Sequence, residues 1–255
     1  MRNYTKAYLK ERPLFLSLIR GREAKLFRDK FPLERPILDF GCGDGFFAKT
    51  LFGDFGKIET GIDVDIKKIN KAKKERIYKK VIFYKGCKLP FPDKTFSSVV
   101  SNCVLEHVTD LEKNLEEIRR VLVPGGKFIC TVMTCEWEKY LFGNVIPGGI
   151  YKKWMRNKQI HNYLLSKRQW DLKFVGAEFE IETVEGYLDR KASRWLDFLH
   201  YVSIPSLVSY KLFGKWVLFP QKYDILWADR IIERLGKNGK VPVSKSAALF
   251  YVLKR

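Results

Sequence analysis

Three glycines at alternate positions mark the first segment of the chain that could bind a ligand. Gly41, Gly43 and Gly45 follow a short apolar run, Ile37–Phe40, and precede a segment that resembles a helix. Glycine can adopt positive φ angles and has no Cβ atom, so a turn built from it lets the backbone approach a ligand closely. The pattern therefore predicts a strand, a tight turn that contacts a ligand, and a helix.

An acidic residue further along indicates the chemistry of that ligand. Asp63 ends a second apolar segment, Ile58–Ile62, about twenty residues after the first glycine. At this spacing a carboxylate can accept hydrogen bonds from ribose hydroxyl groups, so the two features together indicate a nucleoside cofactor. The dinucleotide fingerprint needs another glycine where this chain has Phe46, which disfavours NAD and FAD.

At this point the chain resembles the class I S-adenosylmethionine (SAM) dependent methyltransferases. Their first motif has the form acid-x-Gly-x-Gly-x-Gly and is matched by Asp39 through Gly45. The segments that resemble the later motifs follow in the family's order: Gly61–Asp65, Leu89–Phe96, Ser101–Val108 and Glu117–Lys127. Each motif is weak alone, but their joint order over residues 37–133 is specific.

The resemblance implies a fold, a cofactor and a set of contacts. The fold is α/β, a Rossmann-like, seven-stranded, mostly parallel sheet flanked by helices, with strand order 3-2-1-4-5-7-6. The cofactor is SAM, and the product is S-adenosylhomocysteine. The cofactor-binding residues that we predict are Asp39, Gly41, Cys42, Gly43, Gly45, Asp63, Val64, Cys87, Asn102 and Leu105.

Two positions depart from the family pattern, because Cys87 and Ser97 stand where the family usually has acids. The first acid typically contacts the adenine amino group. A thiol accepts such a hydrogen bond poorly, so the backbone near residues 86–88 would have to supply it. The second acid is mostly structural. These departures keep open a function without catalysis, in which the protein has the SAM fold and acts as a scaffold.

We expect a single domain with an insertion before its last strand, in which helices rich in aromatic and basic residues form a cap. The expected parts are an N-terminal helical segment (1–34), a SAM-binding core (35–135), the completion of the sheet (136–186 and 247–255) and the cap (187–246). Breaks at Pro205 and Gly214 predict two short amphipathic helices in the cap. They would suit a membrane interface, with Lys211, Lys215 and Lys222 towards water, or they would form a lid over the sheet.

The charge balance predicts an anionic partner or surface. The chain has 48 Lys and Arg against 29 Asp and Glu, a formal net charge of +19. The densest basic block, Lys67–Lys80, is expected to be the helix after the second strand. It is either a solvated helix face or a site of attraction to the phosphates of nucleic acid or anionic lipids.

The number and spacing of the cysteines and the lengths of the apolar runs indicate where in the cell the protein is expected. The five cysteines are odd in number and form no C-x-x-C pair, which favours reduced thiols over a disulfide framework or a zinc site. No uncharged apolar run reaches the roughly 18 residues of a membrane span, and no signal peptide is evident. We expect a cytoplasmic protein, or one peripheral to the inner membrane face.

Methyl transfer depends mainly on positioning and water exclusion, and needs a general base only for some acceptors. His107 and His161 are the candidate bases, and each could instead make structural hydrogen bonds. His200 is expected to pack among aromatic side chains, and Glu136 and Trp137 could line the acceptor side. We expect no metal site, because no cluster with metal-ligand spacing is visible in the sequence.

These observations predict a SAM-dependent methyltransferase acting on a small-molecule or lipid-like acceptor, by O- or C-methylation, in peripheral contact with an anionic membrane. RNA methylation is the alternative enzymatic function. It is disfavoured because no separate RNA-binding domain is visible, and because Asn102–Leu105 differs from the Asn-Pro-Pro-Tyr motif of amino methylation.

Overall fold

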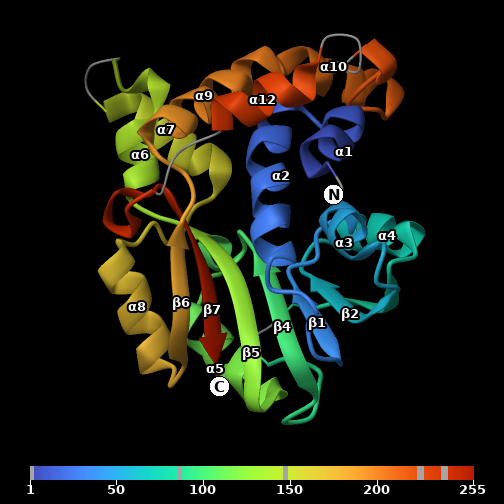
Figure 1. The fold of residues 1–255 in the computed structure, drawn as a ribbon, viewed down its shortest axis with the longest axis vertical. Coiled ribbons are helices and arrows are strands. Elements are labelled where there is room, and N and C mark those ends of the chain that lie inside the picture. The colour runs from blue at the N-terminus through green and yellow to red at the C-terminus, as the bar shows by residue number, and fades with distance from the viewer. Residues whose placement is uncertain (1–2, 86–87, 146–148, 223–226, 237–240) are drawn as a thin grey trace.

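A seven-stranded sheet organises the computed structural model, which describes residues 3–85, 88–145, 149–222, 227–236 and 241–255 (Figure 1). The strand order is β3-β2-β1-β4-β5-β7-β6, which confirms the predicted order. The strands are β1 (Ile37–Phe40), β2 (Ile58–Asp63), β3 (Tyr78–Phe83), β4 (Phe96–Asn102), β5 (Leu122–Met133), β6 (Glu180–Gly186) and β7 (Ala248–Lys254). The first five pair in parallel, whereas β7 runs antiparallel to both β5 and β6.

The central strands are buried on both faces of the sheet, because their successive side chains point to opposite faces and helices cover each face. Ile37 of β1 and Ile129 of β5 belong to one apolar cluster, and their neighbours Leu38 and Phe128 belong to the other. One face is covered by α5 (Leu111–Val121) and α8 (Lys167–Gly176). On the other face lie α2 (Leu14–Arg28), α3 (Phe46–Phe52) and α4 (Ile66–Glu75).

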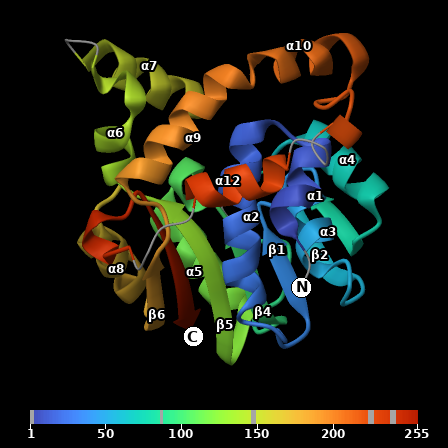
Figure 2. The same ribbon diagram turned by 45° about the horizontal axis from the view of Figure 1, so that its top comes forward.

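A layer of helices crosses one end of the sheet (Figures 1 and 2). It comprises α9 (Arg190–Val202), α10 (Ile204–Phe213) and α12 (Ala228–Gly236), which all lie between β6 and β7 in the sequence. The N-terminal helix α1 (Tyr4–Glu11) and α2 pack against α12, and α2 also packs against α9. The remaining elements at this end are η1 (Leu105–His107), α6 (Glu136–Tyr140), η2 (Phe142–Val145), α7 (Ile150–Gln159) and η4 (Val243–Lys245).

The predicted breaks in the cap lie at helix ends. Pro205 occupies the first turn of α10, where its missing N–H and fixed φ angle are tolerated. Gly214 ends the same helix in a left-handed conformation, with φ at 69°. The cap therefore contains two successive helices, α9 and α10, joined at Ser203.

The prediction of one helix over Lys67–Lys80 was wrong. Helix α4 ends at Glu75, Arg76 adopts a left-handed conformation with φ at 55°, and β3 begins at Tyr78. Charge density carries no periodicity, so it did not reveal the end of the helix. Lys79 and Lys80 thus lie on a strand, and the lysines of α4 surround a narrow buried face of Ile69 and Ala72.

Candidate functional site

A cavity of about 770 Å³ lies at the carboxyl ends of β1, β2 and β4. Seven of the predicted cofactor residues line it: Asp39, Gly41, Cys42, Gly43, Asp63, Val64 and Asn102. Two others do not. Gly45 begins α3 and packs against Ala72, and the Leu105 side chain is fully buried in the core. Cys87 lies outside the described residues.

The glycine turn forms a cradle that a side chain would fill. Gly43 has φ at +56°, and a Cβ atom placed on it would meet no protein atom within 4 Å. The space in front of this residue therefore belongs to the cavity. Gly41, at φ +80°, is needed for a different reason, because its Cβ would approach a methyl group of Val104 to 2.4 Å. The turn thus fits a ligand that lies directly against its backbone.

The two predicted cofactor-binding acids, Asp39 and Asp63, are held differently, and Asp44 and Asp65 also line the cavity. The Asp63 carboxylate accepts hydrogen bonds from the backbone N–H groups of Gly43 and Asp65, both at 2.9 Å. Each of its oxygens keeps a lone pair for a further donor, such as a ribose hydroxyl. Asp39 accepts a hydrogen bond from the Tyr78 hydroxyl at 2.7 Å. Burial raises the pKa of Asp39 to about 7, although the Tyr78 hydrogen bond opposes the shift.

Residues that the sequence analysis did not single out close this cavity. Tyr8 of α1 and Arg12, directly after that helix, line it, and the Arg12 guanidinium pairs with Asp44 at 2.7 Å. From the cap, Tyr210 and Trp216 stack on each other with ring centroids 4.2 Å apart, and both line the cavity. Lys71 of α4 donates a hydrogen bond to the Tyr210 hydroxyl. No spacing rule connects these residues, because they come from three segments that are far apart in the sequence.

A smaller cavity of about 220 Å³ adjoins the first one. The two share Leu16, Arg20, Cys103, His107 and Gln159. Its other lining residues are mostly apolar: Phe15, Ile19, Met133, Trp137 and Leu196, with Glu106, His161 and His200. We refer to the two as the cofactor cavity and the acceptor cavity, after the roles that we propose for them below. Trp137 lines the acceptor cavity, whereas Glu136 does not and pairs with Lys139 at 2.5 Å.

All three histidines of the chain line the acceptor cavity. The rings of His107 and His161 stack with centroids 4.9 Å apart. Burial lowers the pKa of His107, and it lowers that of His161 to about 4, so both imidazoles are neutral at pH 7. His200 is packed, because its ring stacks on Phe15 at 3.8 Å.

Buried charges surround the acceptor cavity. Glu23 is fully buried, pairs with Arg20 at 2.6 Å and accepts a hydrogen bond from the Tyr187 hydroxyl at 2.8 Å. Glu106 is also fully buried, yet neither of its carboxylate oxygens has a hydrogen-bond partner in the described part of the chain. Burial raises the pKa of Glu106 to about 7, although the nearby backbone N–H groups of Glu106 and Met133 and the charge of Arg20 oppose the shift. Glu106, His107 and His161 form a cluster of potential metal ligands that we did not expect, because it joins two distant segments.

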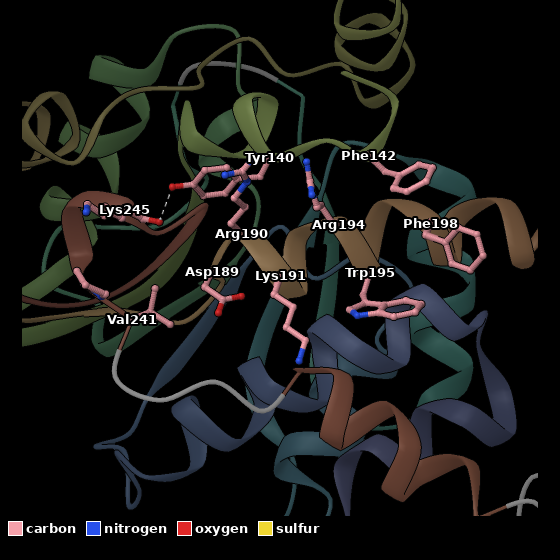
Figure 3. Close-up of a pocket in the computed structure, with 11 residues that line it drawn as sticks. Tyr140, Phe142, Asp189, Arg190, Lys191, Arg194, Trp195, Phe198, Val241 and Lys245 are labelled. Atoms are coloured by element: carbon pink, nitrogen blue, oxygen red, sulfur yellow. Dashed lines mark hydrogen bonds between the residues drawn. The ribbon is translucent and has the colours of Figure 1, made fainter. Parts of the chain in front are cut away.

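A third cavity, of about 1020 Å³, opens on the other side of α9 (Figure 3). Basic and aromatic side chains converge on it: Arg190, Lys191, Arg194 and Lys245, with Tyr140, Phe142, Trp195 and Phe198. It shares no lining residue with the other two cavities. Its acid, Asp189, accepts a hydrogen bond from the backbone N–H of Ala192 at 2.8 Å and so caps α9. The composition suits an anion with an apolar body.

Comparisons with known proteins show what the chain is similar to. Residues 38–130 match the family model described as a methyltransferase domain. The chain is 37% identical over 98 residues to a sterol 24-C-methyltransferase of Gibberella zeae, a match that covers 36% of this chain and 26% of that protein. It is 30% identical over 164 residues to the ubiquinone/menaquinone biosynthesis C-methyltransferase UbiE of Rickettsia bellii, which covers 55% of this chain and 66% of that protein.

Among solved structures, the chain is similar to geranyl diphosphate C-methyltransferase from Streptomyces coelicolor A3(2). The TM-score is 0.61 at 15% identity, over 94% of this chain and 77% of that chain, which shows a shared fold. The fold and the glycine cradle define a nucleoside-binding α/β domain. The match places residues 38–130 in a class I SAM-dependent methyltransferase domain, for which SAM is the cofactor. The chain spans about a quarter to two thirds of these curated relatives.

Proposed function

We propose that the protein transfers a methyl group from SAM to an amphipathic or lipid-linked acceptor, by O- or C-methylation, at the surface of an anionic membrane. The observation that carries this proposal is the apolar acceptor cavity that adjoins the cofactor cavity. SAM supplies an electrophilic methyl group. An apolar acceptor body would pack against Phe15, Met133 and Leu196, and the residues shared by both cavities lie where the reacting atoms would meet.

The protein's contribution to such a reaction is positioning and the exclusion of water. The glycine turn and Asp63 would hold the cofactor, and Tyr210 and Trp216 would cover it from the cap. The neutral His107 could accept a proton from an acceptor hydroxyl, and no base is needed for a carbanion acceptor. Cavity shape therefore decides the acceptor more than any single side chain does.

The relatives support the apolar character of the acceptor. Their printed names refer to a sterol, to ubiquinone or menaquinone, and to geranyl diphosphate. The family match covers residues 38–130, which include three of the residues that line the acceptor cavity, Cys103, Glu106 and His107. The acceptor class is therefore inferred from this chain's own lining residues, with the names as support.

The cap supports membrane contact. Helix α10 has no buried residue, and its apolar side chains are exposed: Ile204, Leu207, Val208, Leu212 and Phe213. Leu218 and Phe219 continue this surface, and Lys211, Lys215 and Lys222 lie beside it in the sequence. Exposed apolar side chains interspersed with lysines suit the interface of an anionic bilayer. In the described part of the chain, no helix is both long enough and apolar enough to cross a bilayer.

Cofactor binding is tested by titrating the purified protein with SAM and S-adenosylhomocysteine in a calorimeter. We expect binding by the wild type and its loss in Asp63→Ala. Absence of binding by the wild type would contradict methyl transfer and favour a scaffold that does not use the cofactor. Methylation of lipids extracted from a membrane, followed with isotopically labelled SAM, would then identify the acceptor.

Membrane contact is tested by flotation with vesicles that contain anionic phospholipid. The side chain of Leu212 on α10 is 70% exposed and that of Leu172 on α8 is 62% exposed, so they form a matched pair. We expect Leu212→Glu to reduce vesicle binding several-fold and Leu172→Glu to leave it unchanged. Equal binding of both variants would refute docking through α10. Retention of RNA at physiological salt that depends on the lysines of α4 would instead favour the RNA alternative.

A further inference from the structure

We infer that Glu106, His107 and His161 bind a divalent transition-metal ion, such as Zn²⁺, where the cofactor and acceptor cavities meet. Each residue offers one ligand atom, and the three atoms lie within 4.8 Å of one another. Glu106 and His107 come from η1, which follows β4, and His161 comes from the loop between α7 and α8. Metal binding by this cluster does not depend on the proposed methyl acceptor.

Unpartnered polar atoms point to a missing ligand. Both carboxylate oxygens of Glu106 and the Nδ1 atom of His161 are buried and lack a hydrogen-bond partner within the described residues. Buried polar groups are nearly always paired, and an unpaired group signals an absent ion, water or ligand. The guanidinium of Arg20 bonds to Glu23 and does not reach the Glu106 oxygens. A cation held by one carboxylate oxygen of Glu106 and by the imidazoles would give each of these residues a partner.

Hydrogen bonds hold the two ligand segments together. The backbone N–H groups of Asn162 and Tyr163 donate to the Glu106 carbonyl at 2.8 and 3.0 Å. The Asn162 amide nitrogen donates to the carbonyls of His107 and Val108 at 2.9 and 3.0 Å. These contacts fix the position of His161 relative to η1 before any ion arrives.

The orientation of His107 suits metal ligation. Its Nδ1 atom lies 3.0 Å from the Ile160 carbonyl, to which it can only donate a hydrogen bond. This bond fixes the tautomer and leaves the Nε2 lone pair free. Histidine ligands usually donate their other ring N–H to a carbonyl or carboxylate in this way.

Backbone strain flanks both ligand segments. Cys103, shortly before Glu106, has φ at 51°, and Ile160, directly before His161, has φ at 53°. Left-handed conformations are uncommon for residues other than glycine and unfavourable for a β-branched residue such as isoleucine. Strain of this kind clusters at ligand sites, where the surrounding structure enforces it. Here the two left-handed residues, Cys103 and Ile160, precede the two segments that carry the proposed ligands.

The ligand set selects the ion and suggests its use. Two imidazole nitrogens and one carboxylate oxygen suit Zn²⁺, Fe²⁺ or Co²⁺ rather than Mg²⁺ or Ca²⁺, and they leave coordination positions open. In the O-methylation branch of the proposed function, an acceptor hydroxyl bound to the ion would lose its proton to solvent more readily. The oxygen would then form the new bond to the methyl carbon as the S–CH₃ bond breaks, and the sulfur would keep that electron pair.

The test uses the full chain, stripped with a chelator and titrated with Co²⁺ and with Zn²⁺ in the absence of SAM. We expect one ion per chain with a Co²⁺ absorption band, and an affinity lower by on the order of 100-fold in Glu106→Gln and in His161→Ala. His200→Ala is the matched control, because His200 lines the same cavity outside the cluster. Circular dichroism and urea unfolding, which need no ligand, would show that each variant is folded.

Absence of metal binding by the wild type, or equal affinity of wild type and His161→Ala, would overturn the site. The result is independent of the proposed function, because neither SAM nor an acceptor is present in the titration. A chain that binds Zn²⁺ through these residues but does not bind SAM would retain the metal site and lose the methyl-transfer proposal. A chain that binds SAM but no metal ion would contradict the metal site and leave the methyl-transfer proposal standing.

Discussion

The cofactor cavity and the cap build their surfaces from different materials. At the cofactor cavity, the predicted cofactor contacts are backbone atoms of the glycine turn and two acids, Asp39 and Asp63, that are nearly inaccessible to solvent. In the cap, α10 contributes no buried side chain: Tyr210 lines the cofactor cavity, and the exposed side chains of the helix are mainly apolar. The cofactor cavity is therefore determined by the spacing of residues close in sequence and by packing in the core. The cap is determined by the contacts between helices that are distant in sequence.

This difference predicts that changes at the glycine turn have the largest effects, and that two of its glycines, Gly41 and Gly43, respond differently. Gly41→Ala places a methyl group against Val104 at a positive φ angle, so we expect a loss of about 2–4 kcal/mol in the free energy of unfolding. Gly43→Ala meets no protein atom, so we expect a loss of about 1 kcal/mol from the φ angle alone.

Measuring SAM affinity in the same two variants distinguishes backbone strain in the turn from blocking of the cofactor cavity. Gly43→Ala projects its methyl group into the cofactor cavity, so SAM affinity should fall strongly although the fold is retained. Urea unfolding gives the stability of both variants, and calorimetry gives the affinity. Equal destabilisation of the two variants, or unimpaired SAM binding by Gly43→Ala, would contradict the description of the turn as a cradle.

The features that could be predicted from the sequence belong mostly to the glycine turn and the sheet, and those that could not depend on contacts between distant segments. The strand order, the glycine turn and Asp63 could be predicted, because each depends on residues close in sequence and on the properties of glycine and carboxylate. The burial of the Leu105 side chain could not be predicted, because a motif does not say which side of a short 3₁₀ helix faces the core. The proximity of His107 and His161 could not be predicted, because it depends on the contacts of Asn162 with η1.

The buried acid of the glycine motif should make stability depend on pH. The pKa of Asp39 rises from 3.8 to about 7 on folding, so the folded state binds more protons than the unfolded state between these values. The free energy of unfolding should therefore fall as the pH rises from about 4 to 7, by up to about 4 kcal/mol from this group. Glu106, with its pKa also raised to about 7, acts in the same direction.

Asp39→Asn removes this titration and keeps an acceptor for the Tyr78 hydroxyl. We expect the variant without cofactor to lose less stability between pH 5 and pH 8 than the wild type does. Urea unfolding at the two pH values measures this difference. An unchanged pH dependence in the variant would show that Asp39 titrates near its ordinary value.

Asp63→Asn should have an intermediate effect. One amide nitrogen must replace an oxygen that now accepts from Gly43 or Asp65, so one buried donor loses its partner at a cost of about 1–3 kcal/mol. SAM affinity should fall at least tenfold. Asp110→Asn is the control, because Asp110 caps α5 away from the cavity and asparagine caps a helix about as well. Equal loss of affinity in both variants would indicate a general loss of the fold.

The smallest expected effect tests the contact between the two regions. Lys71 of α4 donates to Tyr210 of the cap, and its ammonium lies 4.9 Å from the Tyr210 ring centroid. Exposed contacts of this type contribute less than about 1 kcal/mol, so Lys71→Met should leave the unfolding free energy nearly unchanged. If the cap covers the cofactor, SAM should nevertheless dissociate a few-fold faster. Lys73→Met, on the same helix but outside the cavity, should alter neither quantity, and an unchanged dissociation rate in Lys71→Met would show that the cap does not retain the cofactor.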